Sequence, residues 1–158
     1  MPQSKYLMVS GEATSINPSR NIEEANILFQ DGKSYKNTHN IINKKSKLIY
    51  AETRFKKTLN DYPESDKADD AAYELADIYD SYYFKDYESA AFYYIKCYNI
   101  NENTDKPALF KAAWVYDKHL KNFKEAVKNY NKVLQNSKDE AHRSTAKTRL
   151  EQLKKEGY

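Results

Sequence analysis

The sequence of 158 residues has few of the residues that interrupt helices, because it contains only three glycines and four prolines. Charged residues make up 31% of it and hydrophobic residues 40%. This balance is typical of helices with one solvent-facing side and argues against a β-sandwich or barrel, which needs many turns. The composition therefore predicts an all-α protein.

Cysteine and long apolar runs are also scarce. Cys97 is the single cysteine, which excludes an internal disulfide and leaves no second thiol for a metal site. The longest apolar run, Ala90 to Ile95, falls far short of the roughly 20 residues that span a bilayer, so we expect no transmembrane segment. The apolar stretch from Tyr6 to Val9 is too short for a signal peptide. Two locations stay open, the cytoplasm or an exported form whose signal has been trimmed.

One spacing recurs along the chain. A small residue is followed by a tyrosine three positions on, and a later alanine is followed by an aromatic residue four positions on. The pattern returns after roughly 36 to 44 residues, a period typical of arrays of helix pairs. Such a pair cannot bury its apolar face alone, so neighbouring pairs must stack and leave a groove along one side. The residues of the pattern are Gly32, Tyr35, Ala51 and Phe55, then Ala76, Tyr79, Ala90 and Tyr94, then Ala113, Tyr116, Ala126 and Tyr130.

The array divides into three repeats and a cap. Residues 1–20 have no hydrophobic period and are rich in Ser, Thr, Pro and Gly, so we expect an extended lead-in or linker. The first helix is predicted to begin at Asn21, whose side chain can cap it. The last helix places Ala146, Leu150 and Leu153 on one face and charge elsewhere, as a capping helix requires. We predict one domain over residues 21–156, with repeats at about 21–63, 65–102 and 105–137 and the cap at 139–156.

The run Leu75-Ala76-Asp77-Ile78-Tyr79, followed by Tyr87 and Ala90, resembles a tetratricopeptide repeat. The second half of the same motif is matched by Ala51, Phe55 and Pro63. This resemblance implies a right-handed solenoid of three helix pairs plus a C-terminal capping helix. It also implies a non-enzymatic scaffold or adaptor for protein–protein interaction.

Three short runs are similar to a bacterial envelope subfamily of these repeats, which includes the Tol-Pal coordinating protein and the lipoprotein subunit of the outer-membrane β-barrel assembly machinery. They are Tyr62-Pro63-Glu64-Ser65, Ala68-Asp69-Asp70-Ala71 and Tyr73-Glu74-Leu75-Ala76. The similarity implies a place in a cell-envelope assembly, in the periplasm.

The first helix of each pair lines the concave side of such stacks, and residues at i, i+4 and i+7 share one stripe of it. The stripe contains a column of aromatic residues beside columns of charge. It would bind an extended segment or a helix of a protein or peptide partner by contact with apolar side chains, with the charges setting direction. The alternative is that these aromatics pack against adjacent helices. The predicted partner-binding residues are Phe29, Lys33 and Lys36, then Tyr73, Asp77 and Asp80, then Phe110, Trp114 and Asp117, with Lys118 beside Trp114.

Residues for other chemistries are not in the required patterns. His39, His119 and His142 stand in separate contexts without ligand spacing, which argues against a metal or catalytic site. No nucleophile has a nearby base, and the sequence has no glycine-rich phosphate loop. No base-reading motif is present either. We therefore predict no enzymatic activity, no cofactor, no metal and no nucleic-acid partner.

Charge is unevenly distributed along the chain, although the net charge is only +3. Residues 33–57 carry eight basic residues against one acid, and residues 61–90 carry ten acids against two lysines. This favours contacts between neighbouring layers, or a partner of mixed charge, over a generic polyanion. The alternative function is therefore a self-associating structural protein, in which the basic second helix of one molecule meets the acidic third helix of another.

Overall fold

The computed structural model describes residues 18–39 and 43–158, and within these ranges it contains helices and turns but no strand. The all-α class predicted from composition is confirmed. The described elements are α1 (Pro18–Lys36), α2 (Lys44–Asp61), α3 (Ala68–Asp80), α4 (Tyr87–Ile100), α5 (Ala108–Val115), the π-helical turn η1 (Tyr116–Leu120), α6 (Phe123–Asn136) and α7 (Glu140–Lys155).

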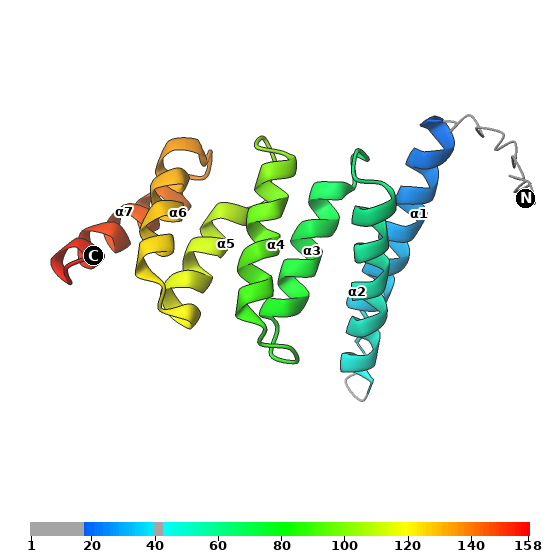
Figure 1. Ribbon diagram of the computed structural model, residues 1–158, viewed down its shortest axis with the longest axis horizontal. Coiled ribbons are helices and arrows are strands. Elements are labelled where there is room, and N and C mark those ends of the chain that lie inside the picture. Colours follow the sequence, from blue (N-terminus) through cyan, green and yellow to red (C-terminus); the bar gives the residue numbers. More distant parts are fainter. Residues whose placement is uncertain (1–17, 40–42) are drawn as a thin grey trace, which may run out of the picture.

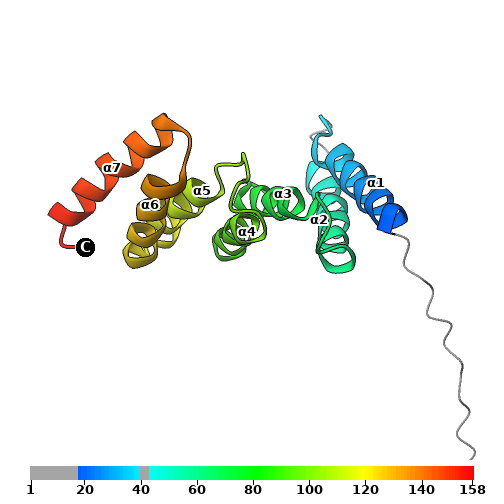
Figure 2. The same cartoon turned by 90° about the horizontal axis from the view of Figure 1, so that it is seen from above.

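The helices pack in chain order, each one against the next, and form a single elongated row (Figure 1). Seen from above, α1, α3, α5 and α7 lie along one side of the row and α2, α4 and α6 along the other (Figure 2). We call the first side the inner face and the second the outer face. The ends of α1 and α7 rise above α3 and α5, whereas α2, α4 and α6 lie at about one level in this view.

The recurring spacing of the sequence is a packing pattern. Its last aromatic residue is fully buried in every repeat, as Phe55, Tyr94 and Tyr130. The alanine four positions earlier is also fully buried and lets the helices approach closely. Gly32 has the same role, because a Cβ atom there would lie 2.7 Å from Cε1 of Phe55. The small residues therefore make room for the rings of the adjoining helix.

The turn between the two helices of a pair is built alike in the second and third repeats. Lys85 and Lys121 adopt left-handed backbone conformations, with φ of 51° and 53°. The next residue caps the following helix in each case. The Asp86 carboxylate accepts a hydrogen bond from the Ser89 N–H, and the Asn122 side chain accepts one from the Glu125 N–H.

The buried side chains form two clusters. The larger spans α1 to α5 and includes Cys97, whose thiol pKa is raised by burial to about 12. The smaller spans α5, α6 and α7 and includes Tyr130 and Val133. The face of α7 that was expected to cover the last repeat does pack on α6, through the buried Ala146 and Leu153.

One predicted boundary changes. The first helix begins at Pro18, so Asn21 lies in its first turn and is not its cap. Of the predicted lead-in 1–20, residues 18–20 are therefore helical, and residues 1–17 lie outside the described residues. The α-helical part of α5 ends at Val115, because the chain widens into η1 for its last turn.

Candidate binding face

The lysines predicted on the first helix bind acids of the same molecule. Lys33 Nζ lies 2.5 Å from Glu74 Oε1, and Lys36 Nζ also pairs with the Glu74 carboxylate. Lys36 Nζ lies 3.0 Å from Asp77 Oδ2 as well. Glu74 is buried, and Lys36 and Asp77 are partly buried. These charges tie α1 to α3 and are not free to set the direction of a partner.

The predicted residues Asp80 and Asp117 stand at equivalent positions, each directly after the tyrosine of its repeat. Tyr94 Oη donates to Asp77 Oδ1 at 2.7 Å and lies 3.4 Å from Asp80 Oδ2. Tyr130 Oη donates to Asp117 Oδ2 at 3.3 Å. The column of acids therefore satisfies the hydroxyls of the buried tyrosines.

The first repeat lacks this contact, and its residues differ accordingly. Phe55 takes the place of Tyr94 and Tyr130 and has no hydroxyl, and the residue equivalent to Asp80 is Lys36. The alternation of lysine and aspartate along the stripe thus follows from the internal needs of each repeat.

Asp117 is the most buried of the predicted charged residues, with 1% of its surface exposed. Arg149 of α7 binds it through two bonds, Nε to Oδ2 at 2.7 Å and Nη2 to Oδ1 at 2.9 Å. Lys118 Nζ lies 3.0 Å from the same Oδ2. Burial alone raises the pKa of the Asp117 carboxyl, but the bonds from Arg149 and Lys118 outweigh it and hold the pKa below its usual value. Asp117 therefore holds α7 on η1, and its assignment to a partner is corrected.

The predicted aromatic residues differ in how far their side chains are exposed to solvent. Phe29 is only 6% exposed and packs on Phe55, with ring centroids 5.6 Å apart. It belongs to the core, so its assignment to a partner is also corrected. Tyr73 is half-buried, with its ring edge-on to Tyr94. Phe110 is half-buried too.

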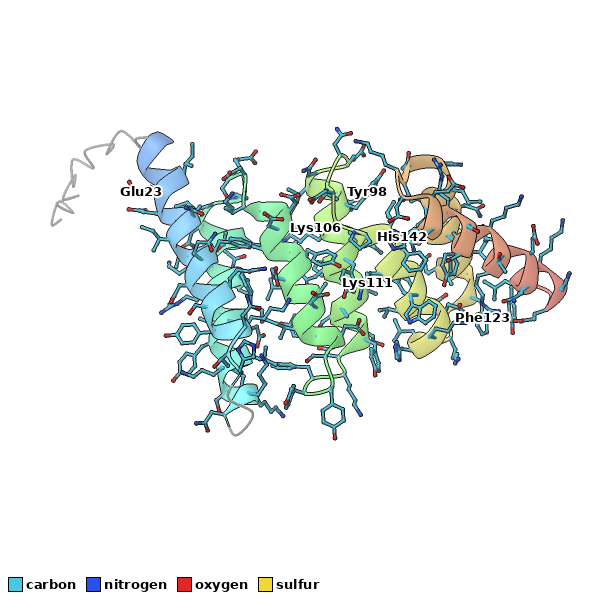
Figure 3. The ribbon with its side chains drawn as sticks, turned by 180° about the vertical axis from the view of Figure 1, so that it is seen from behind. Glu23, Tyr98, Lys106, Lys111, Phe123 and His142 are labelled. Atoms are coloured by element: carbon cyan, nitrogen blue, oxygen red, sulfur yellow. The ribbon has the colours of Figure 1, made fainter. Side chains whose placement is uncertain are left out.

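Trp114 is the exposed member of the predicted set, at 41%. Its ring lies 6.3 Å from that of Phe110, and Lys118 Nζ stands over it at 5.4 Å from the centroid. Lys111 precedes Trp114 by three residues and Lys118 follows by four, so both flank it on one helix face. Figure 3 shows the inner face, with Lys111 near its middle.

A cavity of about 440 Å³ opens at the N-terminal end of α5, between the loop that precedes this helix and the loop that precedes α7. Its lining includes Tyr98, Lys106, Phe110 and His142, and Tyr98, Lys106 and His142 gather there in Figure 3. The His142 ring lies 4.4 Å from that of Phe110, and its Nδ1 is 3.3 Å from Asp139 Oδ2. The sequence did not place His142 near the stripe, because the contact depends on how α7 returns over α5.

No cluster of three or more His, Cys, Asp or Glu side chains suited to a metal ion occurs in residues 18–39 and 43–158. In the same ranges, no helix combines the length and apolar character that crossing a bilayer requires. Comparisons of the chain with protein-family models, curated proteins and solved structures found no match.

Proposed function

We propose that this protein is a non-enzymatic scaffold or adaptor with tetratricopeptide-like architecture, whose inner face binds a peptide segment or a protein surface. The sequential helix pairs, the shared turn at Lys85 and Lys121, and the repeated tyrosine–aspartate contact support it. In this proposal the helix pairs wind as a right-handed solenoid and α7 is the cap. A cell-envelope assembly in the periplasm is the setting implied by the sequence resemblance.

The exposed ring of Trp114 carries the proposal. Tryptophan is enriched among the residues that dominate binding energy at interfaces, where a large apolar area meets one polar group. The ring lies between Lys111 and Lys118 on one helix face, and the half-buried ring of Phe110 lies 6.3 Å from it and extends the apolar area. A bound segment would follow α3 and α5, because the lysines of α1 are already paired with Glu74.

The alternative is self-association through the basic α2 and the acidic α3. Fewer acids of α3 are available for it, because two of them pair with lysines of α1 in the same molecule. Glu74 is buried on Lys33 and Lys36 within one molecule, and Asp77 is paired with Lys36. Light scattering at low salt and high protein concentration separates the two proposals, because association driven by these charges would be strongest there.

A displayed library of unstructured peptides provides the test of the inner-face proposal. We expect enriched peptides to bind the wild type and to lose about 30-fold in affinity for Trp114→Ala, as removal of an interface hot spot does. Asn131→Ala, on the exposed side of α6, is the matched control and should bind equally well. A library that yields no Trp114-dependent peptide would refute the inner-face proposal.

A further inference from the structure

The two faces of the row differ in charge. The helices of the outer face, α2, α4 and α6, contain ten Lys or Arg residues against four Asp or Glu. The elements α1, α3, α5, η1 and α7 of the inner face contain ten against eleven. Because consecutive helices alternate between the faces, the chain separates charge across its thickness, and the outer face carries the positive excess.

One lysine recurs at the same position of every outer-face helix. It stands two residues after the buried aromatic of that helix, and two residues turn an α-helix by about 200°. The lysine therefore lies on the side that faces away from the core. The three residues are Lys57, Lys96 and Lys132.

Part of this charge has no acid to neutralise it. Three of the four acids on these helices already pair with lysines, as Glu52 with Lys56, Asp61 with Lys57 and Glu125 with Lys128. Lys96, Lys124 and Lys132 have no carboxylate of the described residues within 4 Å. Lys96 and Lys132 stand over tyrosine rings, each at 6.0 Å from the centroid, and such contacts leave the ammonium charge in place.

Large apolar side chains project among the lysines. Phe92 is 59% exposed and precedes Lys96 by four residues, so the two are neighbours on the outer side of α4. Ile49, on α2, is 48% exposed. An aliphatic side chain gains nothing from phosphate or from solvent, but it gains from burial at the boundary between lipid headgroups and acyl chains.

We propose that the outer face binds an anionic phospholipid surface. Lysines of α2, α4 and α6 contact the headgroups, and Phe92 and Ile49 insert beneath them. A single-stranded nucleic acid is bound in grooves that follow its backbone, whereas α2, α4 and α6 lie at about one level (Figure 2), as contact with a planar lipid surface requires. The proposal uses the face opposite Trp114 and is independent of the proposed peptide binding.

Flotation with lipid vesicles tests the proposal on the whole chain. We expect the protein to float with vesicles of phosphatidylcholine that contain about 30% phosphatidylglycerol and not with phosphatidylcholine alone. Binding should fall steeply between about 0.1 M and about 0.5 M salt, since exposed charges are screened. Equal binding to both vesicles would overturn the proposal.

Matched charge variants locate the surface. The triple variant Lys96→Gln, Lys124→Gln, Lys132→Gln breaks no ion pair and should lower the vesicle partition coefficient by about 100-fold. The control changes three exposed lysines of α7 and removes the same charge, with an expected loss of less than about fivefold. Its substitutions are Lys147→Gln, Lys154→Gln and Lys155→Gln.

A single-lysine variant and a competition with oligonucleotide distinguish membrane binding from misfolding and from general polyanion binding. Lys124→Gln alone, at an exposed position, should lower binding by about fivefold, and an unchanged unfolding curve would show that misfolding is not the cause. Equal losses in the two triple variants would show a net-charge effect and refute the assignment to this face. A single-stranded oligonucleotide that displaces the protein from vesicles at equal phosphate concentration, through the same lysines, would show a general polyanion site and refute the membrane proposal.

Discussion

At the scale of single residues, most of the predicted charged residues of the inner face form ion pairs within the same molecule. Lys36 pairs with Glu74 and Asp77, and Asp117 pairs with Arg149. These bonds join α1 to α3 and η1 to α7, which are far apart in sequence. What remains accessible is the group around Trp114, and this is why the proposed partner surface is centred there.

The buried ion pair of Asp117 leads to a pH-dependent prediction. The pKa of Asp117 is lower in the folded protein than in the unfolded chain, so the pair stabilises the fold above about pH 4 and this stability is lost as pH falls through the folded pKa. We expect Asp117→Asn to lower the free energy of unfolding at pH 7 by about 2–3 kcal/mol. This is less than a fully buried pair would cost, because Arg149 keeps Glu156.

Urea denaturation at pH 7 and at pH 3 measures this effect. The difference between Asp117→Asn and wild type should shrink at pH 3, because this is below the ordinary pKa of the carboxyl in the unfolded chain, about 3.9. Asp105→Asn, which changes an exposed carboxylate, is the control and should match wild type at both values. A difference that does not depend on pH would show that packing, and not charge, is what Asp117 contributes.

At the scale of elements, the turn between paired helices is set by one backbone conformation. Lys85 and Lys121 occupy the left-handed region, which costs most side chains about 1–2 kcal/mol and glycine very little. Each is followed at once by a capping Asp86 or Asn122. The left-handed lysine is therefore a locally strained residue, and it is followed directly by the capping residue at which the second helix begins.

Replacement of the strained lysine should stabilise the protein. We expect Lys121→Gly to raise the free energy of unfolding by about 0.5–1 kcal/mol, because glycine adopts φ near 53° without a Cβ clash but loses more backbone entropy. Lys121→Val should lower it. Chemical denaturation measures both, with Lys128→Gly inside α6 as a control that should cost about 1 kcal/mol. Loss of stability in Lys121→Gly would contradict the strain argument.

At the scale of the whole molecule, the helices contact mainly their neighbours in sequence, and the core is divided into a larger and a smaller cluster. In such arrays, stability is approximately a sum of local terms. The smaller cluster buries fewer side chains than the larger and sits at the C-terminal end. Its helices should therefore open first.

Fluorescence can follow the two ends separately, since Trp114 is the single tryptophan. We expect the urea midpoint from Trp114 fluorescence to lie below the midpoint from far-UV circular dichroism. A variant with Trp114→Phe and Tyr50→Trp moves the probe to α2, where Tyr50 is exposed and contacts Tyr35, and should give the higher midpoint. Coincident midpoints for all three signals would indicate a single cooperative unit.

Part of the fold and of the candidate binding face could be predicted from the sequence. The all-α class and the recurring positions of Phe55, Tyr94 and Tyr130 follow from composition and local spacing, although the predicted start of the first helix does not match Pro18. The burial of Phe29 and Asp117 and the ion pair of Lys33 could not be predicted, because they depend on contacts between helices. The positive outer face was hidden for a related reason. Residues 33–57 and 61–90 form blocks of opposite charge in sequence, but the fold distributes each block over both faces.

The nearest-neighbour order of the row also determines how the protein would respond to force. With helices that contact mainly the preceding and following ones, tension applied at the two ends would pass through every interface in series. Small rotations at each interface would add up to a large change in length before any helix unwinds. The protein should therefore extend like a soft spring, with peeling of α7 from α6 as its first irreversible step.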